Sequence, residues 1–503
     1  MKQEYQSVLQ AGIEKKYIML EEEIEKDIVR RIQKAEKITS TADWQIQRYI
    51  VLGHSTEDVE KLIRSAVGGD QEEVFRLYDE VIEQEYVRSK AIYEQVNAYF
   101  VPYEQNYELQ QLTNALIQQS NDELFNISRS LGFMVDIGGG RKAFAPLSEI
   151  YNGYLDNAIT MMASGAFDYN TLIRKVVGEM TASGLRTVDY ASGHSNRVDV
   201  AARRALLTGM GQLTGHISRM NGQALRTDKY EVDWHPGARP DHAKWQGRVW
   251  TYQQLVDVCG LGSGSGLLGW NCRHTYYPFL DGISVRNYSD EWLAETERKE
   301  TQKVSYRGRE YNLYEATQKQ RRMETAMRAQ REKAQLLKQG GADKDDVLIA
   351  RCKYQSMLDE YKEFSRKFKL PEQRERIYYD LRGRVAPSQR TYKEYKTVEE
   401  NRKKVRIPDT KIDSFFLKPG AKHAQEFFDA GYTEKDGKKL RRDILLQYNE
   451  DRATDKKTLT DGAERFSIFV ELGIGQNRKT FRMVWQKDSA DAKPRLITGH
   501  RED

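Results

Sequence analysis

A short central segment, residues 231–284, most constrains how this chain can fold. It holds four of the seven tryptophans, three of the eight histidines and two of the three cysteines of the 503-residue chain. Its densest stretch, GWNCRHTYYPF at 269–279, follows a run of glycines. Glycines and aromatic residues in this pattern do not favour a long helix. We therefore expect a compact module of loops and short strands at residues 231–290.

The chain before this module has the periodicity of helices. Residues 1–130 contain a single proline, and stretches such as EEEIEKDIVRRIQKAEKI repeat isoleucine at near-helical spacing. Residues 131–230 combine the glycine turn DIGGGRKAF with further helix. Within them, 195–225 carries a stripe of small residues that permits close helix packing. These two regions are predicted to be mainly α-helical.

Residues 291–385 return to a charged helical pattern, broken by GGADKDD at 340–346, which predicts a helical hairpin. The apolar residues of the second arm recur at alternating spacings of three and four: Val347, Ala350, Tyr354, Met357, Tyr361, Phe364 and Phe368. The partner stripe on the first arm is Met323, Met327, Ala334 and Leu337. The polar residues 386–404 show little periodicity and are predicted to be a linker.

The last region, residues 405–503, changes to an α+β pattern. RFSIFVELGIG and KTFRMVWQK alternate apolar and polar residues around GQNR, which predicts a hairpin, and PRLITGH supplies a final short strand. The fold class is thus mainly α in the N-terminal and middle regions, with a small loop-and-strand module and a C-terminal α+β domain.

Composition restricts the function classes. The chain is 39% hydrophobic and 31% charged, and its net charge of +5 is too balanced for a dedicated nucleic-acid binder, so only weak DNA contact is expected. Three cysteines cannot form a disulfide framework, which favours assembly in a reducing cytoplasm. The N-terminus lacks a signal sequence, and the chain lacks an apolar run of the ~18 residues needed for a membrane anchor.

The sequence GSGLLG at 264–269 matches the glycine pattern of dinucleotide-binding folds. That pattern requires a helix directly after the glycines. Here WNCRHTYYPF follows, with aromatic residues and Pro278. We interpret the glycines as a flexible loop without a nucleotide.

Metal binding is a second hypothesis for the module. Cys272 and His274 are two residues apart and would face the same side of a strand. The candidate ligands of a structural zinc ion are His235, His242, Cys272 and His274, with Cys259 or Asp241 as substitutes. The usual paired spacing of zinc ligands is absent, so the alternative is that these residues are buried structural groups without a cofactor.

Cysteine catalysis is a third hypothesis, in which Cys272 would act with a histidine base and Asp241. The neighbouring aromatic residues favour burial of the thiol, and an activated thiolate needs a partly exposed, electropositive setting. We therefore favour a structural core for the module. Its motif residues are Trp234, Asp241, Trp245, Gly247, Trp270, Asn271, Arg273 and Pro278.

These residues also carry a resemblance. VDWHPGARPDHAKWQGRVWTYQQL and GLLGWNCRHTYYPFLDGIS resemble the phage minor capsid protein 2 family, which is related to head-morphogenesis proteins of the phage Mu type. VDVAARRALLTG and KLPEQRERIYYDLRGRV fit the same family, so the resemblance covers roughly residues 20–385. Related proteins often have more cysteines around this module, where this chain has His235, His242 and His274.

The resemblance implies a non-enzymatic minor head protein present in few copies. Its expected partners are the portal and other capsid proteins, together with further copies of itself. Its expected location is the phage head, assembled in the cytoplasm of the bacterial host. The family implies no catalytic residues.

The C-terminal region is similar to a small uncharacterised domain at the ends of polymorphic-toxin and phage proteins, and its helix-then-sheet order resembles compact ribonuclease-like folds. That resemblance implies an alternative, a virion-carried toxin with an immunity protein as partner. His423 and His500 would be its acid and base, and Lys418, Lys422 and Arg495 would contact phosphate.

Overall fold

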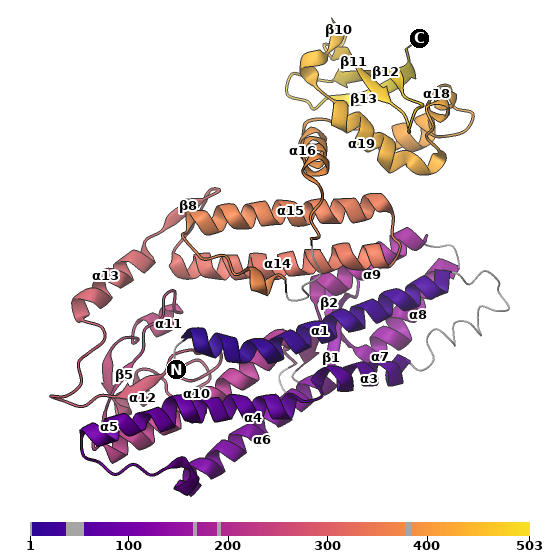
Figure 1. The fold of residues 1–503 in the computed structure, drawn as a ribbon. Coiled ribbons are helices and arrows are strands. Elements are labelled where there is room, and N and C mark those ends of the chain that lie inside the picture. The colour runs from indigo at the N-terminus through magenta and orange to yellow at the C-terminus, as the bar shows by residue number, and fades with distance from the viewer. Residues whose placement is uncertain (1–2, 37–54, 164–167, 189–192, 379–383, 503) are drawn as a thin grey trace. The chain divides into compact units, whose positions relative to one another are not determined.

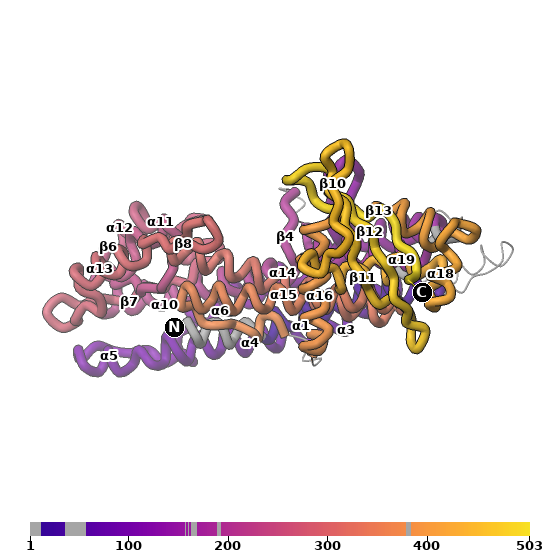
Figure 2. The backbone as a smooth tube through the Cα atoms, turned by 90° about the horizontal axis from the view of Figure 1, so that it is seen from above, coloured from indigo at the N-terminus to yellow at the C-terminus, as the bar shows by residue number. Residues whose placement is uncertain are grey.

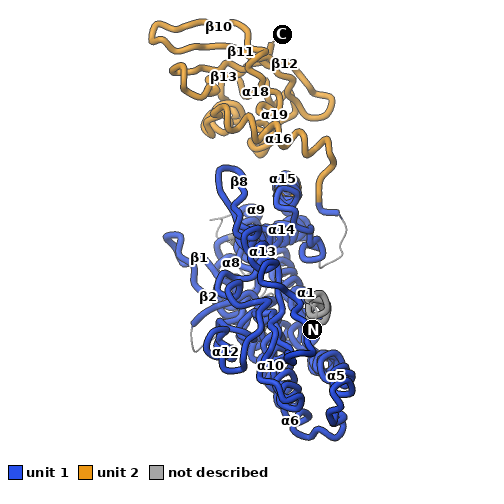
Figure 3. Tube along the Cα trace, turned by 90° about the vertical axis from the view of Figure 1, so that its left-hand side faces the viewer, with its two compact units in different colours: residues 1–350, 356–385 blue, residues 351–355, 386–503 orange. Residues whose placement is uncertain are grey.

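The structure is a computed structural model. It describes residues 3–36, 55–163, 168–188, 193–378 and 384–502. The chain divides into two compact units (Figure 3). The helical unit comprises Met1–Ala350 and Ser356–Val385, and the C-terminal unit comprises Ala386–Asp503 with Arg351–Gln355.

Long helices form the N-terminal part of the helical unit, as the isoleucine periodicity predicts (Figure 1). Helix α10 packs against α1, α4 and α6. Its small residues allow this approach, because a Cβ atom at Gly209 would lie 1.9 Å from the Tyr78 hydroxyl. The helices of this part are α1 (Gln3–Glu36), α3 (Ser55–Val67), α4 (Asp70–Val81), α5 (Lys90–Gln95), α6 (Tyr107–Arg129), α7 (Leu147–Glu149), α8 (Leu155–Ala163), α9 (Tyr169–Ser183) and α10 (Val198–Ala224).

A four-stranded sheet lies among these helices, in the order β2-β1-β3-β4. The predicted glycine turn joins its first two strands, which pair antiparallel from Gly132 opposite Pro146 to Asp136 opposite Lys142. The strands are β1 (Leu131–Asp136), β2 (Lys142–Pro146), β3 (Arg186–Val188) and β4 (Ser195–Arg197).

The central module has the loop-and-strand character expected from its composition. Its three-stranded sheet has the order β6-β5-β7, and its elements gather near α10 (Figure 2). The Tyr276 hydroxyl donates a hydrogen bond of 2.8 Å to the carbonyl of Gly215 in α10. A Cβ atom at Gly215 would lie 2.3 Å from Leu268 Cδ1, so any larger residue would force the Leu268 side chain to move. The elements are β5 (Lys229–Val232), α11 (Pro240–Ala243), β6 (Val249–Thr251), α12 (Tyr252–Asp257) and β7 (Tyr276–Pro278).

The helical hairpin predicted after the module is present as two long antiparallel helices (Figure 1). Tyr361 donates a buried hydrogen bond of 2.9 Å across the pair to Glu324. The first arm differs from a continuous helix, because a short hairpin of two strands turns at Arg307 and Gly308, both with positive φ. The elements are α13 (Asp290–Thr301), β8 (Val304–Tyr306), β9 (Arg309–Tyr311), α14 (Leu313–Gln339) and α15 (Lys344–Lys367).

The C-terminal unit is α+β, as predicted, with helices followed by an antiparallel sheet in the order β10-β11-β12-β13. The predicted hairpin pairs in register from Glu464 opposite Lys487 to Leu472 opposite Lys479. Strand β10 was not expected, because all five of its residues are polar and exposed. The elements are α17 (Asp409–Lys411), α18 (Ala424–Asp429), α19 (Gly437–Gln447), β10 (Thr454–Thr458), β11 (Glu464–Leu472), β12 (Lys479–Lys487) and β13 (Arg495–Arg501).

Residues 386–404, expected to be a linker, instead contain helix α16 (Gln389–Lys404), which belongs to the C-terminal unit. Ser388 caps its N-terminus, and Val398 is buried in the C-terminal core. With so few apolar residues on this helix, its buried face leaves almost no periodicity in the sequence. Across the described residues, no helix combines the length and the apolar character needed to cross a membrane.

Candidate metal centre in the central module

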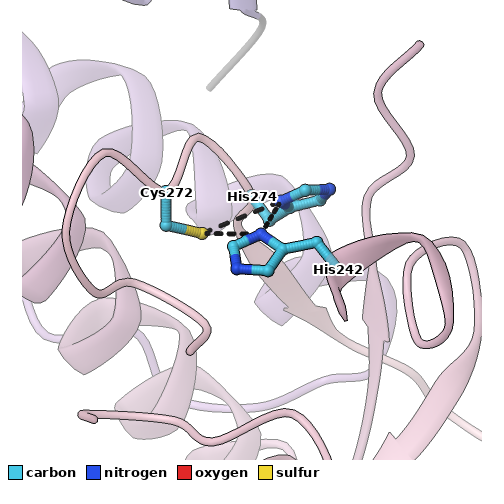
Figure 4. A group of neighbouring side chains, drawn as sticks. All are labelled: His242, Cys272 and His274. Atoms are coloured by element: carbon cyan, nitrogen blue, oxygen red, sulfur yellow. Dashed lines mark hydrogen bonds between the residues drawn. The ribbon is translucent and has the colours of Figure 1, made fainter. Parts of the chain in front are cut away.

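Three buried side chains of the module converge on one point (Figure 4). The two imidazole Nδ1 atoms of His242 and His274 lie 3.3 Å apart. Cys272 Sγ lies 3.9 Å from His242 Nδ1 and 3.7 Å from His274 Nδ1. Three of the four ligands expected from the sequence are therefore brought together.

Two separate segments place these side chains. His242 lies in the short helix α11, which begins with Pro240 at its first position. Cys272 and His274 lie just before β7, and Asn271 ahead of them adopts a left-handed backbone conformation with φ of 56°. That turn lets the Cys272 amide donate to the Gly269 carbonyl at 3.0 Å. The turn at Asn271 and the loop that leads into β7 thus hold the thiol and the imidazole.

Neighbouring oxygen atoms orient both imidazole rings. His242 Nε2 lies 2.9 Å from the Ser265 carbonyl, and His274 Nε2 lies 2.9 Å from Gln246 Oε1. The Gln246 oxygen is an acceptor, which favours the proton on Nε2 of His274. At His242 the Ser265 carbonyl also favours a proton on Nε2, but the Arg239 guanidinium beside that nitrogen carries only donors and favours the opposite tautomer. The Arg239 guanidinium also donates to the Ser265 carbonyl and lies against His242 Nε2.

Burial keeps all three groups neutral. It lowers the pKa of His274 well below its usual value, and the nearby His235 and His242 lower it further. Burial also lowers the pKa of His242 and raises the pKa of the Cys272 thiol to about 11. A thiol with this pKa is protonated at neutral pH, so the arrangement does not provide the activated thiolate that cysteine catalysis requires.

The other proposed ligands are not members of the cluster. His235 packs its ring on His274, with centroids 4.7 Å apart, but its Nε2 lies 3.1 Å from the Arg273 carbonyl and from Asp233 Oδ2. The Asp241 side chain is largely exposed and lies beside Arg239. Cys259 is buried in the hydrophobic core of the module, outside the group of converging ligand atoms.

The aromatic-core interpretation fits part of the motif. Trp245 is buried, and its ring packs on His242 and His274. Trp234 packs edge-to-face on Trp292, with ring centroids 5.0 Å apart. Trp270, by contrast, is 61% exposed, which corrects the expectation that it lies in the core.

The remaining motif residues have different structural roles. Asn271 is exposed and shapes the turn before Cys272, and the Arg273 carbonyl accepts from His235. A Cβ atom at Gly247 would lie 2.7 Å from Leu293 Cδ2, and Pro278 pairs with Tyr230 in the sheet.

The glycine loop, interpreted from the sequence as flexible, is tightly folded. A Cβ atom at Gly266 would lie 2.1 Å from the Gly260 carbonyl oxygen, and one at Gly269 would lie 2.3 Å from that of Ser263. Turns and strand β7 follow the loop in place of the helix that a dinucleotide site requires. The glycines therefore serve the tight folding of the loop.

A second group of converging buried side chains was not found from the sequence. Glu21 and Glu25 of α1 and Glu332 of α14 lie with their oxygens within 4.8 Å of one another. We call these three residues the buried acidic cluster. In the sequence, EEEIE at 21–25 places Glu21 and Glu25 four residues apart on one otherwise apolar helix face, which could have indicated the pair. Only the fold brings Glu332 to them as the third carboxylate.

In the C-terminal unit, the structure brings together the two histidines proposed as acid and base. The rings of His423 and His500 have centroids 5.8 Å apart, and His423 Nδ1 lies 2.8 Å from Glu426 Oε1. Lys418 and Lys422 are exposed in the loop just before His423.

Arg495 lies apart from this pair. It is five residues before His500 in strand β13, a distance of roughly 16 Å at the usual rise per residue. Its guanidinium donates to Asp488 Oδ2 at 2.9 Å. Arg495 is thus not placed to share a phosphate with the two histidines.

Comparison with known families agrees with the resemblance seen in the sequence. A family model described as Phage minor capsid protein 2 matches residues 1–365. The match includes the whole central module and most of the helical unit, so the class is that of phage capsid components. The chain belongs to the phage minor capsid protein 2 family. No curated protein and no solved structure matches the chain.

Proposed function

We propose that this protein is a minor component of the phage head that binds the portal and supports head assembly. It would be made in the host cytoplasm and incorporated into the virion in few copies. The family match over residues 1–365 carries this proposal. The helical unit would supply the binding scaffold, and neighbouring copies would be further partners.

The module offers a specific surface for such binding. Trp270 projects from the glycine loop and is 61% exposed, while the loop beneath it is fixed by its own hydrogen bonds. Its indole ring lies close over Gly264. Exposed tryptophans on a rigid support are frequent centres of protein interfaces. We therefore assign Trp270 as the anchor of the module against the portal.

Co-purification with the portal protein of the same phage or prophage tests the proposal. The full-length chain should be retained by the tagged portal in a fixed ratio, and imaging should place it at the portal vertex. Trp270→Ala should weaken retention about tenfold or more, as expected for an interface anchor. Phe469→Ala is the matched control, because Phe469 is also exposed but lies in the C-terminal unit outside the family match.

Failure of the unmodified chain to bind the portal, at good soluble expression of both proteins, would contradict the proposed function. Equal retention of the Trp270→Ala chain and the control would contradict only the role of Trp270.

The His423–His500 pair favours a second candidate function, an RNA-cleaving toxin in the C-terminal unit. The carboxylate of Glu426 can hold the His423 ring through Nδ1, which leaves Nε2 for proton transfer. His500 lies close enough to act on the same substrate. General acid–base catalysis by two such groups is sufficient for phosphodiester cleavage when cations bind the phosphate.

Expression of the full chain in a bacterial host tests this second function. A toxin should arrest growth and degrade RNA, and both effects should be lost in His423→Ala and His500→Ala but retained in Arg495→Ala. Arrest should also be relieved by the product of an adjacent immunity gene. Normal growth and intact RNA at good soluble expression would exclude ribonuclease activity.

A further inference from the structure

We propose that His242, Cys272 and His274 bind one zinc ion, which joins helix α11 to the segment that leads into β7. This site goes beyond portal binding and does not depend on it. The proposal rests on the geometry of the three ligand atoms, on the groups that orient them and on their burial.

The separations of the ligand atoms match those around tetrahedral zinc. With bond lengths of about 2.05 Å to nitrogen and about 2.3 Å to sulfur, a tetrahedral angle places two nitrogens about 3.3 Å apart and sulfur about 3.6 Å from each nitrogen. The observed N–N distance is 3.3 Å, and the observed S–N distances are 3.7 and 3.9 Å. One ion can therefore reach all three atoms without rearrangement of the module.

The hydrogen bonds of the two rings also fit metal ligation. Histidines that bind metal through one nitrogen usually donate the other N–H to an oxygen, which fixes the ring. His274 has the Gln246 side chain in this role. His242 has the Ser265 carbonyl, although the Arg239 guanidinium also lies against the same nitrogen and would have to shift for it to donate. Gln246 is itself fixed, because its Oε1 accepts the His235 amide at 3.0 Å.

A zinc ion would replace the hydrogen bonds within this cluster. Without it, one imidazole can carry its proton on Nδ1 and donate across 3.3 Å to the other Nδ1. Zinc satisfies both nitrogens and releases the thiol proton to solvent, so that Cys272 binds as a thiolate. The choice of zinc follows from the mixed sulfur and nitrogen donors and the tetrahedral spacing.

Three protein ligands leave one position for a fourth ligand. Among the described residues, no other histidine, cysteine or acidic side chain joins the group, so we assign this position to a water molecule. All three protein ligands are buried. A water ligand is typical of catalytic zinc sites, so the structural role that we infer rests on the burial of all three protein ligands. In that role the ion would join α11 to the segment that follows Trp270.

The metal content of the full-length protein, purified without chelator, tests the proposal. We expect about one zinc per chain by elemental analysis, and a lower melting temperature after zinc is removed. Cys272→Ser should lose the zinc, and Gln246→Ala should weaken zinc affinity roughly 10–100-fold. Cys259→Ser is the matched control, because Cys259 is a buried cysteine of the same core and should leave the zinc content unchanged.

Cobalt binding to the unmodified chain provides a test that does not depend on whether the variants fold. Co²⁺ added to metal-free protein should produce the intense visible bands of tetrahedral coordination and a thiolate-to-cobalt band in the near ultraviolet. Absence of both zinc and these cobalt bands in folded protein would overturn the proposal. Stoichiometric iron or copper would overturn the assignment to zinc, and zinc retained in a folded Cys272→Ser chain would overturn the ligand set.

Discussion

The buried acidic cluster predicts that the helical unit loses stability as the pH rises, and that Glu332→Gln removes much of this loss. Burial, followed by the nearby charge of Glu21, raises the pKa of Glu332 to about 8. The pKa of Glu25 is also raised, first by burial and then by the charge of Glu332. Both oxygens of Glu25 lack a hydrogen-bond partner among the described residues.

The charges around the cluster explain these shifts. Glu21 is paired with Arg197 at 2.8 Å, and Asp199 is paired with Arg328 at 2.9 Å. Both guanidinium groups are therefore already engaged by other carboxylates. Ionised Glu25 and Glu332 would add two further negative charges to a buried site, which is why protonation is favoured there.

The direction and size of the effect follow from proton linkage. The carboxyl of Glu332 has a pKa of about 8 in the folded chain, against its ordinary value of 4.5. Between these two pH values the folded state holds the proton of Glu332 more strongly than the unfolded state does. The stabilisation from this proton is therefore present at low pH and is lost as the pH rises through 8. For this single group, the loss between pH 4.5 and 8 is on the order of 4 kcal/mol.

Urea denaturation followed by circular dichroism at pH 5, 6, 7 and 8 measures this loss. The unmodified chain and Glu332→Gln should have similar stability at pH 5, and the variant should become the more stable of the two at pH 8. Glu23→Gln is the control, because Glu23 lies on the same α1 helix with its side chain 44% exposed. Stability that rises with pH, or that falls equally in Glu332→Gln, would refute the argument.

Two further substitutions test packing in each unit. Gly215→Ala should destabilise the helical unit by about 1–3 kcal/mol in thermal unfolding, because the new methyl would lie 2.3 Å from Leu268 Cδ1; a more stable variant would show that helix propensity outweighs this contact. Asn401→Ala should cost the C-terminal unit about 2 kcal/mol in urea unfolding, because the Asn401 amide donates to the buried carbonyls of Leu445 and Tyr448 at 2.8 and 2.9 Å. Unchanged unfolding would mean that other groups replace these bonds.

The periodicity of apolar residues predicted secondary structure correctly where an element buries an apolar face. The hairpin of β11 and β12 was predicted with its turn, because alternating residues such as Phe466, Ile468 and Val470 are buried on one side. Helix α16 was missed because it buries little beyond Val398 and Asn401. A helix with so small a buried face has almost no periodicity to detect.

The candidate metal centre was predicted in part. Cys272 and His274 were expected to share a side as residues two apart on a strand. The structure places both in the loop before β7, where the turn at Asn271 precedes them. The sequence offered His235, His242, Asp241 and Cys259 as partners without a means to choose among them. His242 is the partner because α11 directs it inward, whereas His235 is held by Asp233 and the Arg273 carbonyl.

The sequence by itself determined the helical regions, the position of the central module and the family of the protein, because these depend on residue types at short spacings. Only the tertiary structure decided which donors meet and which charges are buried together. Cys272 and His242 are 30 residues apart, and Glu25 and Glu332 lie on different helices, α1 and α14. Contacts between such distant residues depend on how whole elements pack, and the residue spacing within one element does not indicate that packing.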